Sequence, residues 1–150
     1  MKECEIRRYI KSAPISKIDL MDLGKLIVDN NPVDKDFTIS TTIGIHSIKE
    51  KSIEFLLAHK EIPDRLNNFH IICSKYTSNY KNEKYQYIVF GEPSFYLWVS
   101  GCDEVWVRGK FQQIEEFISS KLEQFNEEQK LAAKIEIPTS VASIVKCRKA

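Results

Sequence analysis

Alternating apolar and polar residues predict most of the strands in this chain. The clearest segment is 36–46, where every second residue from Phe37 to Ile45 is directed to one face. This period of two is typical of a half-buried strand, and we expect helices to cover that face. Similar patterns predict strands over 3–11, 68–76, 85–91, 95–101 and 104–109. The last four are separated by turns and one polar loop, which indicates an antiparallel meander.

Apolar residues spaced three or four positions apart predict the helices. Ser16 should cap the first helix, and Asp19 suits the positive end of its dipole. Asn30-Asn31-Pro32 should end this helix, because the residue before a proline disfavours the helical conformation. A second, short helix is predicted over about 52–60, with Ser52 and a Ser47–Glu50 capping box as competing starts.

The strongest helical pattern begins after Gly109. Phe111, Ile114, Ile118, Leu122 and Phe125 repeat with the helical period, and polar residues occupy the opposite face. This predicts an amphipathic helix that lies on a sheet. The segments AAKIEIP and SVASIV, which follow, are interpreted as one or two short strands.

These elements predict an α+β fold with the order β-α-β-α-β-β-β-β-α. The antiparallel sheet should have about five to six strands, with two or three helices packed on one face. A mixed sheet is the alternative. The chain has 150 residues, which suits a single globular domain over 1–150. The N-terminal domain of a longer protein is the alternative interpretation.

Composition and charge narrow the function classes. The chain has 22 Lys and Arg against 21 Asp and Glu, a net charge of +1. The net charge of the whole chain is therefore too small to drive binding to nucleic acid or to an anionic membrane. No apolar stretch approaches the roughly 18 residues of a transmembrane segment, and the first residues are not expected to be a signal peptide.

The cysteines indicate a reducing compartment. Cys4, Cys73, Cys102 and Cys147 are scattered, whereas structural zinc sites need close-set ligand pairs. A disulfide framework is not expected in a chain of this length without a secretion signal. We therefore expect four thiols in a cytoplasmic protein.

Short signatures of catalysis and nucleotide binding are missing from the sequence. It contains no phosphate-binding loop, dinucleotide fingerprint, nucleophile elbow or HExxH motif. We expect no catalytic residue, cofactor or metal. The alternative is a small enzyme with a site near His46, His70, Asp103 and Glu104. If the strands of the two histidines pair, the imidazoles and a carboxylate would support acid–base chemistry or bind a metal.

Aromatic residues with an arginine indicate an interaction surface instead. Tyr96 and Trp98 face opposite to Phe95, Leu97 and Val99, so both faces of that strand are bulky and a second covering layer is implied. The next turn places Asp103 before Trp106 and Arg108, on one face of the predicted strand. Aromatic residues and arginine are enriched at interface centres. The predicted interaction residues are Trp98, Trp106, Arg108, Tyr96 and Asp103.

Residues 75–87 interleave basic and aromatic side chains. Such a segment would stack bases and neutralise phosphates. Glu83 cancels part of the charge, and arginine, the preferred stacking cation, is missing from this segment. Nucleic acid binding through 75–87 is therefore an alternative. The lysines are Lys75, Lys81 and Lys84, and the tyrosines are Tyr76, Tyr80, Tyr85 and Tyr87.

The sequence therefore predicts a non-catalytic protein-interaction or regulatory binding module of a cytoplasmic assembly. It would contact a protein partner or associate with its own copies. A small enzyme and a nucleic-acid binder are the alternatives.

Overall fold

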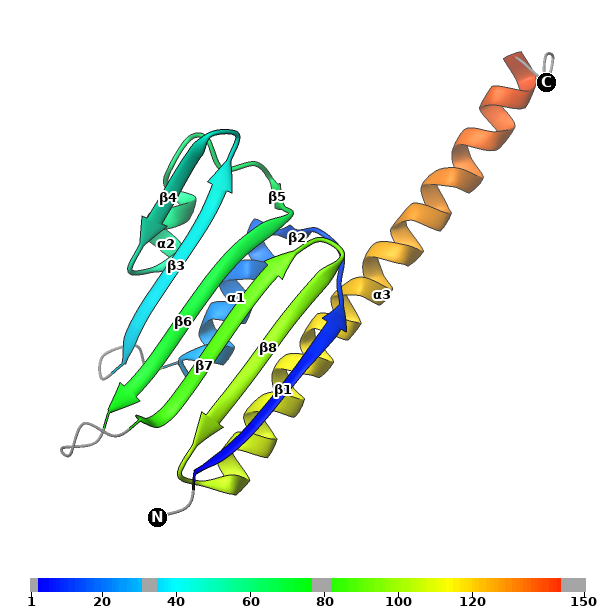
Figure 1. Ribbon diagram of the computed structural model, residues 1–150. Helices are drawn as coiled ribbons and strands as arrows, with labels where there is room; N and C mark the ends of the chain where they lie inside the picture. The colour runs from blue at the N-terminus through cyan, green and yellow to red at the C-terminus, as the bar shows by residue number, and fades with distance from the viewer. Residues whose placement is uncertain (1–2, 31–34, 77–81, 144–150) are drawn as a thin grey trace.

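A computed structural model describes residues 3–30, 35–76 and 82–143. Six strands form one antiparallel sheet in the order β1-β8-β7-β6-β3-β4 (Figure 1). The sheet strands are β1 (Cys4–Lys11), β3 (Asp36–Ile43), β4 (His46–Glu50), β6 (Asn68–Tyr76), β7 (Asn82–Gly91) and β8 (Ser94–Gly101). A separate pair joins β2 (Ile15–Ser16) to β5 (Arg65–Leu66), and the helices are α1 (Lys17–Ile27), α2 (Ile53–Leu57) and α3 (Glu104–Ser143). The predicted α+β class with an antiparallel sheet is confirmed.

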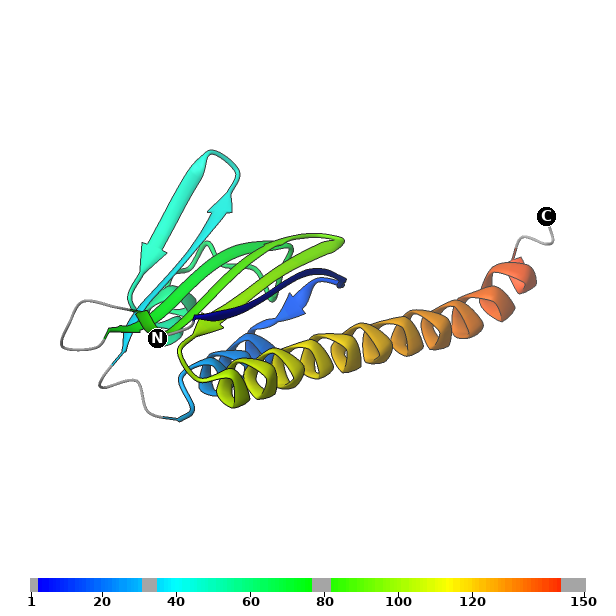
Figure 2. The same cartoon turned by 60° about the horizontal axis from the view of Figure 1, so that its bottom comes forward.

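The helices pack on one face of the sheet. Figure 2 shows α1 and α3 beneath the strands, with α3 running along the β1 side. Alternate strand residues such as Ile71, Ile88 and Leu97 are fully buried against Leu23 of α1 and Ile114 of α3. The opposite face carries no helix among the described residues (Figures 1 and 2). In the part of the chain that the structure describes, helices therefore cover one side of the sheet only, and we call the other side the open face.

Helix α1 begins as its sequence predicts. The Ser16 hydroxyl accepts a hydrogen bond from the backbone N–H of Asp19 at 3.1 Å, which caps the first turn. The helix ends at Ile27, and Asp29 and Asn30 adopt positive φ angles of 55° and 59°. Aspartate and asparagine tolerate this left-handed conformation better than most residues. Pro32, expected to stop the helix, lies outside the described residues.

Two side chains from remote elements cap the carboxyl end of α1. The Gln86 side-chain amide donates to the carbonyl of Ile27 at 2.8 Å. Lys110 donates to the carbonyl of Leu26 at 2.6 Å and to the carboxylate of Asp29. These contacts satisfy carbonyl groups that have no partner inside the helix, and they join α1 to β7 and α3.

The segment predicted as one strand over 36–46 is a hairpin. Strand β3 ends at Ile43, Gly44 has a φ of 63°, and His46 pairs back with Ile43. Glycine adopts this φ without the steric cost of a side chain, and a two-residue turn of this kind reverses the chain. Ile45, expected to face the core, is 94% exposed at the turn.

The predicted Ser47–Glu50 capping box is also wrong, because these residues lie in β4 and pair with β3. The competing cap is correct: the Ser52 hydroxyl accepts a hydrogen bond from the backbone N–H of Phe55 at 3.1 Å. Helix α2 begins at the next residue, Ile53.

The strand predicted over 104–109 is wrong, because these residues form the first turns of α3. The Asp103 carboxylate accepts hydrogen bonds from the backbone N–H groups of Val105 at 3.0 Å and Trp106 at 3.4 Å, which caps the helix. Val107 extends the buried stripe of Phe111 and Ile114 by one turn. Helical packing against the sheet thus decides a segment whose Val-Trp-Val alternation resembles a strand.

Helix α3 extends beyond the sheet (Figure 1). It has 40 residues, which span about 60 Å, about twice the length of the strands. Its buried stripe ends at Ile118, and Leu131 is 60% exposed. The strands expected in AAKIEIP and SVASIV are wrong as far as Ser143, because the helix continues to that residue; residues 144–150 lie outside the described part.

No helix within the described residues has a stretch long and apolar enough to span a lipid bilayer.

Candidate functional site

The open face of the sheet carries a continuous cluster of aromatic side chains, which we call the aromatic face. It consists of Tyr9 on β1, Tyr96 and Trp98 on β8, and Tyr85 and Tyr87 on β7. The register places Tyr9 opposite Tyr96 and Tyr87 opposite Trp98, so the strands bring the rings together. The intervening residues of β8, Phe95, Leu97 and Val99, are fully buried on the helix side. The predicted alternation of β8 is therefore confirmed.

The rings of the aromatic face contact one another across three strands. The ring centroids of Tyr9 and Tyr96 are 4.8 Å apart, and those of Tyr85 and Trp98 are 5.3 Å apart. Tyr87 lies 6.1 Å from Trp98 and 6.4 Å from Tyr96, both in edge-on arrangement. Such pairs favour fixed ring positions. Tyr9 is 74% exposed, whereas the other four rings are partly buried by their neighbours.

Two charged residues of β1 border the aromatic face. The Arg7 guanidinium lies 4.8 Å from the centre of the Trp98 ring and donates to the Glu5 carboxylate at 2.9 Å. The indole N–H of Trp98 donates to the other oxygen of Glu5 at 3.1 Å. The hydrogen bond from Arg7 lowers the pKa of Glu5, with the Trp98 bond a smaller cause. Glu5 and Arg7 thus hold the Trp98 ring in one orientation.

A histidine borders the aromatic face on β6. The Nε2 atom of His70 lies 2.9 Å from the hydroxyl of Tyr87, and the two rings meet edge-on at 5.0 Å. Ile72 and Val89, 38% and 37% exposed, extend the apolar surface beside them. The open face thus combines aromatic rings, aliphatic groups and both signs of charge.

The five predicted interaction residues do not form one surface. Tyr96 and Trp98 lie in the aromatic face. Asp103 caps α3, and Arg108 pairs with Glu104 one turn earlier, at 2.9 Å. Trp106 is half-buried against the core, and the Lys84 ammonium lies 5.1 Å above its ring. Trp106 and Arg108 were expected on one face because 104–109 was predicted as a strand; in a helix, residues two positions apart point in different directions.

The residues of the alternative enzyme site lie apart. His46 is on β4 and His70 on β6, and β3 separates these strands, so they do not pair as the hypothesis requires. His70 lies level with Tyr96 of β8, because both residues are in register with Val89 of β7. Asp103 and Glu104 follow the end of β8 at Gly101, which is about 17 Å along the strand from Tyr96. Within the described residues no group of three or more His, Cys, Asp or Glu is placed to hold a metal ion.

The segment 75–87 divides its basic and aromatic residues between the two faces of the sheet. Tyr85 and Tyr87 belong to the aromatic face, whereas Lys84 points to Trp106 on the helix side. Lys75 approaches Glu83 at 4.0 Å. Residues 77–81, with Tyr80 and Lys81, lie outside the described part. The described lysines thus do not surround the tyrosines as a phosphate-binding rim would.

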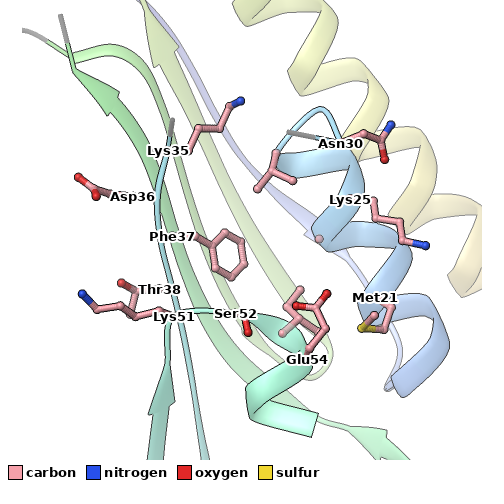
Figure 3. Close-up of a pocket in the computed structure, with 13 residues that line it drawn as sticks. Met21, Lys25, Asn30, Lys35, Asp36, Phe37, Thr38, Lys51, Ser52 and Glu54 are labelled. Carbon is pink, nitrogen blue, oxygen red and sulfur yellow. The ribbon is translucent and has the colours of Figure 1, made fainter. Parts of the chain in front are cut away.

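A cavity of about 530 Å³ lies on the helix side between α1, α2 and the start of β3. Figure 3 shows the Phe37 ring pointing from β3 toward α1, with Met21 and Lys25 on the helix opposite. Val28 and Ile53 complete the apolar part of the wall. The volume is in the usual range of small-molecule sites, about 300–1,000 Å³.

Sequence reasoning missed Arg7 and Tyr9 as site residues and missed the cavity. A usable signal for the aromatic face was present: residues 7 and 9, 85 and 87, and 96 and 98 all place large side chains at alternate positions. Only the strand order shows that these three pairs are neighbours. The cavity has no comparable signal, because its walls come from three separate segments.

Comparisons with known proteins assign no family to this arrangement. No protein-family model matches the chain, and neither a curated protein nor a solved structure matches it.

Proposed function

We propose that this chain is a non-catalytic protein-interaction module of a cytoplasmic assembly, and that its aromatic face binds a second copy of the chain. The observation that carries the proposal is the cluster of five contacting rings on a sheet face that no helix of the described residues covers. Cys4 and Cys73 are free thiols, in keeping with the proposed compartment.

The composition of the aromatic face supports protein contact. Tyrosine, tryptophan and arginine are the residues most enriched at interface hot spots. Trp98 is held between Arg7 and Tyr85, and its indole N–H is fixed by Glu5. Rings already held in place lose little conformational entropy on binding, which favours affinity.

The charges on the open face favour a second copy as the partner. By register, Glu5, Arg7 and Lys11 of β1 and Asp36 of β3 all point to this face, so it carries both signs. In a two-fold contact a surface meets the same surface of the second copy. A face with charges of one sign would repel its copy, whereas a face with both signs can bring opposite charges together.

The size of the open face is adequate for a modest interface. The strands β1, β8, β7 and β6 have eight to ten residues each. Strands about 27 Å long and about 4.8 Å apart give a projected area on the order of 500 Å². Protruding rings increase the accessible area above this projection, toward the roughly 800 Å² per partner of a standard interface.

The proposal is tested by the mass of the chain in solution as a function of concentration. Light scattering and sedimentation velocity should show a monomer at low concentration and a dimer at higher concentration. Trp98→Ala should weaken the dimer because it removes a central ring. Tyr9→Asp should abolish it, because it places a charge from each copy in the contact while replacing a side chain that is 74% exposed in one chain.

Phe55→Asp is the matched control. Phe55 is an aromatic residue of α2, 65% exposed, on the helix side of the sheet. This variant should dimerise as the wild type does. A wild-type chain that remains monomeric up to about 1 mM, which corresponds to a contact weaker than about 4 kcal/mol, would overturn the proposal. So would equal weakening by Tyr9→Asp and Phe55→Asp.

A further inference from the structure

We propose that the cavity between α1, α2 and β3 binds a small amine with an apolar tail, whose ammonium group pairs with Glu54. The cavity lies on the helix side of the sheet and shares no residue with the aromatic face. The inference is therefore independent of self-association. It rests on the apolar walls, on the directions of the charged side chains around them and on the packing that holds the walls in place.

The walls of the cavity are apolar and come from all three elements. Met21 lies on α1, across the cavity from the Phe37 ring of β3 (Figure 3). Val28, which follows α1, and Ile53 of α2 complete the walls. Val28 and Ile53 are buried, whereas Met21 and Phe37 are only partly buried, so these two side chains offer apolar surface that a ligand can cover.

Most charged residues that line the cavity direct their charge elsewhere. The Lys25 and Lys51 side chains extend away from the cavity (Figure 3). Asp36 points to the open face of the sheet, and Lys35 already takes part in an interaction of its own. The charge that remains at the rim is therefore the carboxylate of Glu54.

Glu54 is placed to bind a cation. It lies in the first turn of α2, and in Figure 3 its carboxylate lies between the Phe37 ring and Met21. The carboxylate makes no hydrogen bond or ion pair with another residue that the structure describes. An ammonium group would be attracted to it, whereas a carboxylate ligand would be repelled.

A ligand with both an ammonium group and an apolar tail would match the whole cavity. The tail would cover the exposed surface of Met21 and Phe37, and removal of apolar surface from water favours binding. Small-molecule sites commonly combine apolar walls with a few polar groups that fix the orientation of the ligand. Here the walls would hold the tail, and Glu54 would orient the head group toward the rim.

The walls are held in place by close packing of α1 on α2. A Cβ atom at Gly24 would lie 2.3 Å from the Cδ1 atom of Ile53, so the two helices touch at this glycine. The Ser52 cap fixes the start of α2 beside it, one turn before Glu54 leaves the helix toward the rim. Walls that are already ordered lose little conformational entropy when a ligand binds.

n-Octylamine, which is protonated at pH 7 because aliphatic amines titrate near pH 10, is the probe that tests the inference. Titration of the isotope-labelled chain, followed by amide chemical shifts, should be saturable and should move the resonances of Gly24, Val28, Phe37 and Ile53. Octan-1-ol, with the same tail and no charge, should bind about fivefold more weakly, the effect of one partly exposed ion pair. Sodium octanoate, with the opposite charge, should bind more weakly still. Isothermal titration measures the three affinities.

Two variants and one control make the test specific. Glu54→Gln should weaken octylammonium binding about fivefold and leave octanol binding unchanged. Met21→Trp should weaken both ligands, because the larger side chain fills the cavity. Glu61→Gln, which removes an exposed carboxylate beyond the end of α2, should change neither. Circular dichroism and thermal melting verify that each variant is folded.

Four results would overturn the inference. The first is no saturable binding at millimolar octylammonium. The second is an affinity for octanol or octanoate equal to that for octylammonium, because Glu54 would then select no head group. The third is equal loss of octylammonium affinity in Glu61→Gln and in Glu54→Gln, which would indicate attraction to acidic residues in general. The fourth is a set of shifts confined to the aromatic face, around Tyr96 and Trp98.

Discussion

Replacing Lys110 by methionine should destabilise the fold, because Lys110 caps the carboxyl end of α1 from the core side of α3. The Lys110 side chain is only 2% exposed. Its ammonium donates to the Leu26 carbonyl at 2.6 Å and to the Asp29 carboxylate. Methionine keeps the length and apolar character of the stem and removes the charge and the donors.

The expected loss for Lys110→Met is about 1–3 kcal/mol in the free energy of unfolding. A hydrogen bond from a charged group contributes about 1.5–3 kcal/mol. Two features limit the cost: the Leu26 carbonyl also accepts from the backbone N–H of Asp29 at 3.4 Å, and Asp29, 41% exposed, can return to water. Burial of the ammonium itself is unfavourable, and this cost is relieved in the variant. Lys110→Ala should lose roughly 2 kcal/mol more, since it also removes three buried methylene groups.

Urea unfolding followed by tryptophan fluorescence measures these differences, at a concentration where the chain is monomeric. Lys121→Met is the matched control: Lys121 also joins α3 to α1, through Asp19 at 3.2 Å, but both side chains are about a quarter exposed. This variant should lose less than about 1 kcal/mol. A Lys110→Met chain as stable as the wild type would refute the reasoning. The free-energy cost of burying the ammonium would then be at least as large as the stabilisation from its hydrogen bonds.

Two further predictions concern the core. Burial raises the pKa of Cys73 to about 11; since an unfolded thiol ionises near 9, the free energy of unfolding should fall between about pH 9 and 11 by up to about 1.4 kcal/mol per pH unit. Subtracting the urea stability of Cys73→Ala isolates this slope from other titrating groups, and a parallel pH dependence of the two chains would contradict it. Gly24→Ala should destabilise by up to about 2 kcal/mol, because its Cβ meets the Cδ1 atom of Ile53 at 2.3 Å; this is an overpacking cost of about 1–3 kcal/mol less the roughly 1 kcal/mol gained in helix propensity. Adding Ile53→Val, which lacks the contacting Cδ1 atom, should recover part of the loss in a double-mutant cycle; additive losses would show that this contact is not the cause.

Elements with a strong local signal were predictable. Ser16 and Ser52 start their helices because a serine hydroxyl reaches a backbone N–H only three residues away. The alternation in β8 predicted correctly that Trp98 and Leu97 lie on opposite faces. Such signals need only neighbouring residues, so they do not depend on the rest of the fold.

Segments with two compatible patterns were not predictable. Residues 104–109 alternate as a strand does, yet Val107 also continues the helical stripe of Phe111 and Ile114, and packing against the sheet selects the helix. At 44–46 the period of two continues across a glycine, and only pairing of β4 with β3 shows that the chain reverses there. As a result, Trp106 was expected on the same kind of surface as Trp98 but lies on the helix side.

The sequence by itself determined the fold class, most of the strands and helices, and the two-sided character of β8. Tertiary structure decided which segments became neighbours: it joined Tyr9, Tyr87 and Trp98 in the aromatic face and brought together the walls of the cavity between α1, α2 and β3. Local elements follow from interactions over three or four residues, which a sequence pattern records directly. A site made of side chains from distant segments depends on strand order and packing, and these are set only when the whole chain folds.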